Sequence, residues 1–291
     1  MRKAASIVLL RKNKGKVEVL MAQRSQNLKA FGGAFVFPGG VVEASDGPEG
    51  SMEQLKRCGL RELFEEVGVL LAFQGAKKST QAVQFANAQE RIQWQTKVKD
   101  NAAEFDALLA EKRVQLATDS LFHLVHFTTP VMEPKRFATD FFVVDSGYNE
   151  EDMEFHESET TLLLWITPEE AIARNRRGEM PFLPPQFFCL QMLIQLGSTP
   201  GQIIKHLSQR DSEDEPMPIM PHPVGQPNGP KSLTLCYPGD EQHPDYPVLG
   251  KRHRIHVSLP MGKSGFDMES TLGNKFLTKR MWKQLANQSK L

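Results

Sequence analysis

The sequence predicts an α/β protein in which a mixed β-sheet lies between helices. Two β-rich runs, 4–11 and 17–23, flank a polar, glycine-containing run and predict a hairpin. A helix is expected over 52–67, between a capping residue and a glycine. Later segments continue the alternation of strand and helix, with strand-like runs at 69–73, 121–127, 137–145 and 161–166 and helices at 169–176 and 185–196.

The helix expected over 52–67 has signals at both ends. Ser51 followed three residues later by Gln54 is a capping-box pattern, which marks a helix start. Gly68 is suited to the left-handed conformation that commonly follows a last helical turn. At about 100° per residue, the apolar side chains form the single stripe expected of a helix packed on a core. The stripe consists of Leu60, Leu63, Phe64 and Val67.

Three carboxylates, Glu62, Glu65 and Glu66, lie opposite that stripe. Most acidic runs are simply solvated helix faces. Here, however, Glu62 and Glu66 are like charges four residues apart, a spacing that costs helix stability. Arg61 is placed to pair with Glu65 and leaves the other two uncompensated. A hard dication such as Mg²⁺ would neutralise them, so a metal site and a solvated face both remain open.

Composition and charge exclude several classes of protein. The 291 residues suit one elaborated domain or two small ones. Lys plus Arg and Asp plus Glu each total 35, and this zero net charge argues against bulk binding to nucleic acid or to a membrane surface. No apolar run reaches transmembrane length, and no signal-peptide cleavage pattern follows the N-terminus. The three cysteines are far apart, which indicates neither a disulfide framework nor a zinc site and suits a reducing compartment.

We expect a principal domain over 1–206 and a second part over 207–291. Within the first, residues 80–113 are rich in Ala, Gln, Glu and Lys and contain no Pro or Gly, so a helical insertion is expected at about 74–118. Residues 211–230 are rich in Pro, Asp and Glu, which predicts a loop or linker. A basic, partly strand-like extension follows.

The residues around the carboxylates follow a recognisable spacing, G-x5-E-x7-R-E-U-x-E-E-x-G-U, where U is aliphatic. Its fixed positions are Gly47, Glu53, Arg61, Glu62, Leu63, Glu65, Glu66, Gly68 and Val69. This pattern resembles the Nudix box, and a chance match at all of these positions is negligible. In typical members, the first glycine of the box ends a Phe-Pro-Gly-Gly segment. Here that segment is Phe37 to Gly40, so the chain carries a short insertion after Gly40, and Gly47 and Glu53 match by count alone.

The resemblance implies a Nudix α/β/α sandwich with a mixed β-sheet, a helical insertion and a C-terminal extension. It also implies that Glu62 and Glu66 bind a catalytic Mg²⁺ or Mn²⁺, with Glu65 as a further ligand and the Gly40 carbonyl facing the ion. The catalytic residues that the resemblance implies are Glu62, Arg61 and Glu65. Among them, Arg61 is implied to orient the glutamates rather than to touch substrate. The implied reaction is metal-assisted attack of water on a diphosphate. Which carboxylate acts as the general base that takes the proton from water stays open. Weaker candidates on a later loop are Glu154 and Glu159.

The segment before the box resembles the signature of Nudix enzymes that cleave coenzyme A, L-L-T-x-R-S-x3-R-x3-G-x3-F-P-G-G. The substrate-binding residues that this resemblance implies are Arg24, Ser25, Lys29 and Phe37. Ala22 replaces the threonine, and Lys29 replaces the second arginine. Lysine keeps a charge for the 3′-phosphate but loses the bidentate geometry of arginine. The alternative for Arg24 is an ion pair with an acid of the fold.

The coenzyme A signature, the insertion after Gly40 and the helical segment after the box together resemble one branch of the family. The resemblance covers about residues 1–200. It implies hydrolysis of coenzyme A or acyl-coenzyme A to adenosine 3′,5′-bisphosphate and a 4′-phosphopantetheine. Ser289-Lys290-Leu291 matches the peroxisomal import tripeptide, so we expect a peroxisomal protein whose partner is the import receptor. Neither a membrane nor a nucleic-acid partner is expected.

Two other functions remain open. The chain could cleave another diphosphate, such as ADP-ribose, a dinucleotide or capped RNA, although zero net charge disfavours RNA. It could also be a non-enzymatic Nudix module that binds a nucleotide, but such a module would be expected to have lost box glutamates.

Overall fold

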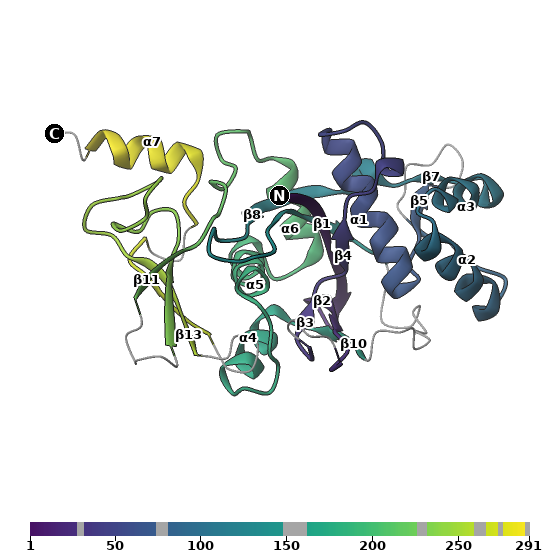
Figure 1. Ribbon diagram of the computed structural model, residues 1–291, viewed down its shortest axis with the longest axis horizontal. Coiled ribbons are helices and arrows are strands. Elements are labelled where there is room, and N and C mark those ends of the chain that lie inside the picture. The colour runs from purple at the N-terminus through teal and green to yellow at the C-terminus, as the bar shows by residue number, and fades with distance from the viewer. Residues whose placement is uncertain are drawn as a thin grey trace.

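A seven-stranded sheet forms the centre of the protein (Figure 1). The computed structural model describes residues 1–27, 32–73, 81–147, 162–225, 232–258, 266–272 and 276–288. The strand order is β10-β2-β1-β9-β8, with β3 paired to β2 and β4 paired to β1. The strands are β1 (Arg2–Asn13), β2 (Lys16–Gln23), β3 (Phe35–Val36), β4 (Gly39–Val41), β8 (Phe122–Thr128), β9 (Phe137–Asp145) and β10 (Leu162–Ile166). β1 runs parallel to β9 and the other described pairings are antiparallel, so the sheet is mixed as predicted.

Helices cover both faces of this sheet. They are α1 (Met52–Val67) on one face and α4 (Pro168–Arg176), α5 (Pro184–Leu196) and α6 (Pro200–Ser208) on the other. The alternation of side chains along β1 supplies both cores, because successive residues of a strand point to opposite faces. Ile7 and Leu9 share a cluster with Leu63 of α1, whereas Val8 and Leu10 belong to the cluster of α5. This is the α/β/α sandwich that the sequence predicts.

The glycines after Phe37 form a strand, although the run Pro38-Gly39-Gly40 by itself predicts a break after the preceding strand. Gly39–Val41 pairs with Ala4–Ser6 of β1 as β4. A Cβ placed on Gly39 would lie 2.4 Å from the Ala5 carbonyl oxygen, so only glycine allows this approach of the two strands. The expected break is therefore wrong, because the missing side chains allow pairing here.

The helical insertion lies beside α1 and consists of two helices, α2 (Ala88–Asp100) and α3 (Glu104–Lys112) (Figure 1). It is framed by the short strands β5 (Leu71–Phe73), β6 (Gln81–Ala82) and β7 (Gln115–Leu116). The helical character expected for residues 80–113 is therefore present, in two helices joined by a short turn. Asn101 has an extended backbone, and its side-chain oxygen accepts a hydrogen bond from the Ala103 N–H, which ends α2. Phe64 of α1 stacks on Phe105 of α3 within a separate small core.

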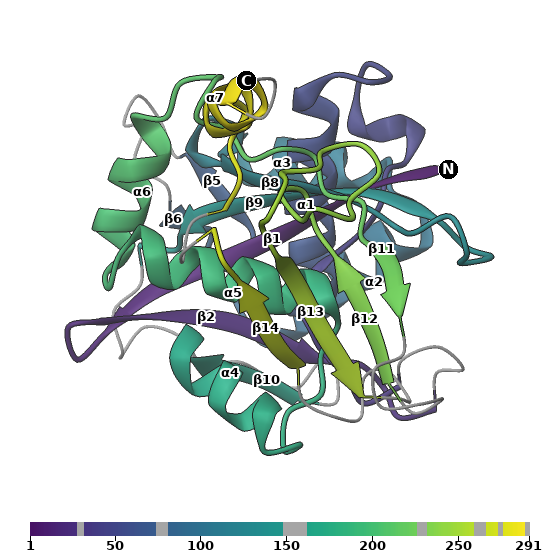
Figure 2. The same ribbon diagram turned by 90° about the vertical axis from the view of Figure 1, so that its left-hand side faces the viewer.

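The C-terminal part forms a second sheet of four antiparallel strands, which lies across α5 (Figure 2). The strands of this sheet are β11 (His222–Gly225), β12 (Ser232–Cys236), β13 (His253–Ser258) and β14 (Phe266–Ser270), and the helix α7 (Lys279–Gln288) follows them. Tyr237 stacks on Phe188 of α5, and Phe266 packs edge-on against Phe187. β11 falls inside the segment expected as a loop. The domain boundary at 206 stays a prediction, but both sides of it contribute to one hydrophobic cluster.

The edge of the main sheet is also covered by the C-terminal part. The Thr128 N–H donates to the Ile219 carbonyl at 2.7 Å, and the Ile219 N–H donates to the His126 carbonyl at 2.9 Å. The Arg210 guanidinium donates to the carbonyls of His123 and Leu124. These bonds satisfy backbone N–H and C=O groups of β8 that an exposed edge strand would present to other chains.

Cys58, Cys189 and Cys236 are buried and unbonded to one another, as the sequence predicts. Within the described ranges, no helix combines the length and the apolar character needed to cross a bilayer.

Candidate active site on helix α1

Helix α1 begins and ends where the sequence predicts. Ser51 Oγ accepts a hydrogen bond from the Gln54 N–H at 3.0 Å, and Gly68 adopts the left-handed conformation with a φ of 78°. The Gln54 side chain does not close the capping box. Instead it accepts from the Gly50 N–H and donates to the Gly47 carbonyl, so it ties the preceding loop to the helix. These bonds fix the start of the helix that carries the three glutamates.

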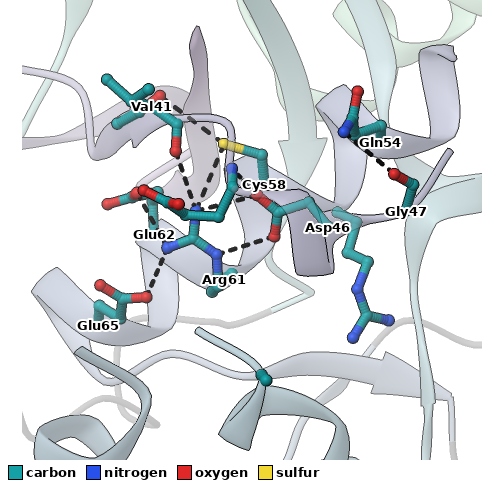
Figure 3. A network of polar contacts seen from close by, with 12 residues as sticks. Val41, Asp46, Gly47, Gln54, Cys58, Arg61, Glu62 and Glu65 are labelled. Carbon is teal, nitrogen blue, oxygen red and sulfur yellow. Dashed lines mark hydrogen bonds and ion pairs between the residues drawn. The ribbon is translucent and has the colours of Figure 1, made fainter. Parts of the chain in front are cut away.

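Arg61 is the centre of a buried polar network (Figure 3). Its side chain is 3 % exposed and forms a two-pronged ion pair with Asp46, at 2.8 and 3.0 Å. One of its terminal nitrogens also donates to Glu62 at 3.0 Å and to Glu65 at 2.6 Å. The predicted Arg61–Glu65 pair is confirmed, whereas the expectation that Glu62 stays uncompensated is wrong, because Arg61 reaches it as well. Arg61 thus holds the directions of both carboxylates.

Asp46 is a site residue that the sequence reasoning missed. It ends a short 3₁₀-helix, Ala44–Asp46, in the insertion between Gly40 and α1. Its side chain is 1 % exposed and holds the guanidinium of Arg61. No spacing rule pointed to Asp46, because its position depends on how the inserted loop folds back on the helix.

The carboxylates of Glu62 and Glu66 lie against the two glycines of β4. A Cβ on Gly40 would lie 2.4 Å from the Glu62 carboxyl carbon, so glycine is required for this contact. The Gly39 N–H donates to Glu66 Oε2 at 3.1 Å. The Gly40 carbonyl accepts a weak bond from the Cys58 thiol at 3.7 Å. The predicted glutamates and Gly40 thus come together at the contact between α1 and β4.

This site carries more negative charge than its own cations balance. Burial raises the pKa of Glu62 to about 7, against the opposing effect of Arg61, and repulsion from Glu65 adds to the rise. Burial likewise raises the pKa of Glu66 to about 7, although the Gly39 N–H opposes it. The pKa of Glu65 is also raised, chiefly by burial. Half-buried carboxylates with pKa values near neutrality favour a bound cation.

A preformed metal cluster is nevertheless not present among the described side chains. No three of the described His, Cys, Asp and Glu residues are gathered closely enough to hold an ion. Arg61 accounts for this, because its bonds draw Glu62 and Glu65 toward the guanidinium. The carboxylate oxygens beside the glycines of β4 are nevertheless the kind of donor that a hard dication prefers.

The substrate-binding residues predicted from the sequence occupy different environments. Arg24 lies near enough to Glu66 to lower its pKa, and its buried Nε has no hydrogen-bond partner among the described residues. Ser25 Oγ accepts from the Asn27 N–H at 3.4 Å in an exposed turn. Phe37 is 2 % exposed and packs edge-on against Phe141 in the core, and its contact with substrate stays a prediction. Lys29 lies outside the described residues, as do Glu154 and Glu159.

A second polar cluster lies on β8 and β9. His123 and His126 both bond to Asp140 Oδ1, at 2.9 and 3.1 Å. A bulge in β8 between His123 and Val125 brings the two imidazoles to one side of the sheet. Both histidines therefore have a structural partner, which the sequence alone did not identify.

Comparison with known proteins agrees with this geometry. A family model described as the NUDT19 Nudix domain matches residues 52–193. "Putative nudix hydrolase 7" of Caenorhabditis elegans is 30 % identical over 249 residues, covering 84 % of this chain and 75 % of that protein. "Acyl-coenzyme A diphosphatase NUDT19" of Xenopus laevis is 25 % identical over 299 residues, covering 84 % and 77 %. A crystal structure of a NUDIX hydrolase from Alicyclobacillus acidocaldarius aligns with a TM-score of 0.57 and 25 % identity, over 67 % of this chain and 91 % of that one.

The sandwich fold and the glutamate-bearing helix packed against a Phe-Pro-Gly-Gly segment define a hydrolase of the Nudix type. The chain belongs to the Nudix hydrolase family. Within that family it resembles the NUDT19 proteins.

Proposed function

We propose that this Nudix hydrolase cleaves the diphosphate of coenzyme A and acyl-coenzyme A, using Mg²⁺ or Mn²⁺. The products are adenosine 3′,5′-bisphosphate and an (acyl-)4′-phosphopantetheine. The observation that carries the proposal is that Arg61 bonds to both Glu62 and Glu65, while the carboxylates of Glu62 and Glu66 lie against the two glycines of β4. The names of the relatives support the substrate class, since two of them are acyl-coenzyme A diphosphatases.

Each residue of the site has a defined task in this proposal. Glu62 and Glu66 hold the ion, and Glu65 is a further ligand. The ion supplies charge neutralisation at the diphosphate and a lowered pKa for attacking water. Arg61, itself fixed by Asp46, sets the directions of Glu62 and Glu65. One of these carboxylates, or another on a later loop, would accept the proton of the water.

The environment of Arg24 supports the proposal that the substrate is anionic. A buried guanidinium nitrogen without a partner is costly, and a phosphate oxygen would satisfy it. The alternative for Arg24, an ion pair with an acid of the fold, stays open, since Arg24 interacts electrostatically with Glu66. In this proposal we assign Arg24 to a phosphate of the substrate, with Ser25 and Lys29 as accompanying contacts.

The decisive experiment offers coenzyme A, acetyl-coenzyme A, ADP-ribose, a dinucleotide and capped RNA in parallel, with and without Mg²⁺. We expect 3′,5′-bisphosphate product from the coenzyme A substrates with metal present. A preference for ADP-ribose, the dinucleotide or the RNA would show that the substrate is a diphosphate other than coenzyme A. Absence of turnover with every substrate would leave the nucleotide-binding module as the function.

Glu66→Gln should abolish turnover and leave folding intact, because the amide keeps the size and loses the charge that binds the ion. The matched control is Glu53→Gln, which changes an exposed residue in the first turn of the same helix. Steady-state rates and thermal unfolding of both variants are compared with the unchanged protein. Full activity of Glu66→Gln would contradict the metal assignment.

We also propose a peroxisomal location, reached through the import receptor that reads Ser289-Lys290-Leu291. These residues lie outside the described part of the chain. A fluorescent protein fused to the N-terminus should mark peroxisomes, and removal of Leu291 should leave it diffuse. A diffuse signal from the intact chain would refute this location.

A further inference from the structure

The inserted helix α2 reaches the end of the helix that carries the glutamates. Gln95 of α2 is 7 % exposed, and its side-chain amide donates to the Phe64 carbonyl at 3.1 Å and to the Glu65 carbonyl at 3.0 Å. Both carbonyls lie in the last turn of α1, where backbone oxygens begin to lack partners within the helix, and the Phe64 carbonyl also accepts from the Gly68 N–H at 2.8 Å. One side chain from the insertion therefore satisfies part of this helix end.

This contact bears directly on the carboxylates. Glu65 is itself one of the two residues whose carbonyl Gln95 holds, and Glu66 is the next residue in the chain. From the opposite side, the Gly39 N–H holds the carboxylate of Glu66. The last turn of α1 is thus fixed between β4 of the main sheet and α2 of the insertion.

The surroundings of Gln95 make this contact specific and rigid. Gln95 lies between Trp94 and Val98, which belong to the small core that also contains Phe64. A Cβ on Gly68 would lie 3.2 Å from the Gln95 side-chain oxygen, so the glycine that ends α1 allows α2 to approach. In such a site, loss of the two hydrogen bonds cannot be compensated by solvent.

We infer that Gln95 is a positioning residue, which sets the directions of the Glu65 and Glu66 carboxylates by fixing the backbone of the last turn of α1. Gln95 touches neither the substrate nor the ion. The inference rests on the proposed function, because it assigns to the helical insertion a role in holding the metal-binding end of α1. Outer groups of this kind typically alter metal affinity or activity by about tenfold or more.

The test compares Gln95→Met with Val98→Ala. Methionine matches the length of glutamine without a donor, and Val98 is fully buried in the same core but makes no bond to α1. Mn²⁺ binding is measured by calorimetry without substrate, alongside kcat, KM and the melting temperature. We expect Gln95→Met to weaken Mn²⁺ binding by about tenfold and to lower kcat with little change in KM. Val98→Ala should lower the melting temperature and leave Mn²⁺ affinity unchanged.

A rescue variant separates positioning from general packing. Gln95→Lys places an ammonium at the C-terminal end of α1, where it can donate to both carbonyls and is favoured by the helix dipole. We expect its Mn²⁺ affinity to lie closer to that of the unchanged protein than the affinity of Gln95→Met does.

The outcomes distinguish this inference from the proposed function. Equal Mn²⁺ affinity in Gln95→Met and the unchanged protein would overturn the positioning role, whatever the melting temperatures. If Gln95→Met weakens Mn²⁺ binding while coenzyme A is never cleaved, the positioning role stands and the proposed substrate fails. An unchanged protein that binds no Mn²⁺ would overturn both the metal assignment and the role of Gln95.

Discussion

At the scale of single residues, the ion pair of Arg61 with Asp46 dominates the site, because both side chains are almost completely buried. Asp46→Ala removes one partner and leaves a buried guanidinium charge only partly compensated. Such a loss typically costs about 3–5 kcal/mol, so we expect the free energy of unfolding to fall by that order. Urea unfolding measures it, with the exposed Glu49→Ala as a control expected to change stability by less than about 0.5 kcal/mol. Equal stability of the two variants would show that Asp46 is dispensable.

The same pair shows which site residues a sequence can reveal. Glu62, Glu65, Glu66 and Arg61 were predictable, since a helix converts their spacing directly into a shared face. Asp46 was not, because it comes from a loop whose path no local rule defines. The burial of Phe37 could not be predicted for a related reason. Its motif places it beside the site, whereas its side chain turns into the core of the sandwich.

Asp140 predicts a measurable dependence of stability on pH. Burial alone would raise its pKa, but hydrogen bonds from His123 and His126 outweigh that effect and lower the pKa to about 2. Because the pKa is lower in the folded than in the unfolded state, the stabilisation is complete above the ordinary value of 3.8. It is lost as the pH falls toward 2, and it amounts to about 2 kcal/mol. Unfolding of Asp140→Asn should therefore show a smaller pH dependence between pH 2 and 5 than the unchanged protein. Parallel curves would contradict this.

At the scale of elements, the contact of β4 with α1 controls the distance between the sheet and the glutamates. Gly40→Ala would place a methyl group 2.4 Å from the Glu62 carboxyl carbon, so helix and strand must move apart. We expect a loss of metal-dependent turnover of about a hundredfold, since small displacements of catalytic groups have effects of that size. The matched control is Gly201→Ala in α6, where nothing lies within 4 Å of the added carbon. Comparable rates for the two variants would show that the contact is not critical.

Elements were predictable where local chemistry determines their ends. Ser51 and Gly68 determined α1, and the helix expected over 169–176 is α4, which begins at Pro168. The insertion was less predictable, since its helix-favouring composition conceals the turn that Asn101 makes. β4 was missed because glycines favour a turn when read alone. In the fold they become a strand, because only they can approach β1 and the carboxylates so closely.

At the scale of the whole molecule, the C-terminal part closes two surfaces that the sandwich would otherwise expose. One is the β8 edge, which bonds to Ile219 and Arg210, and the other is the aromatic face of α5, which receives Tyr237 and Phe266. A chain ending at residue 206 would present both an unpaired edge strand and a large apolar patch, the usual causes of aggregation. We therefore expect this truncated protein to aggregate in size-exclusion chromatography, whereas a chain lacking only Ser289 to Leu291 should elute like the intact one. A monodisperse, cooperatively unfolding 1–206 fragment would show that the sandwich is complete by itself. The C-terminal part would then have a function other than stabilising the catalytic domain.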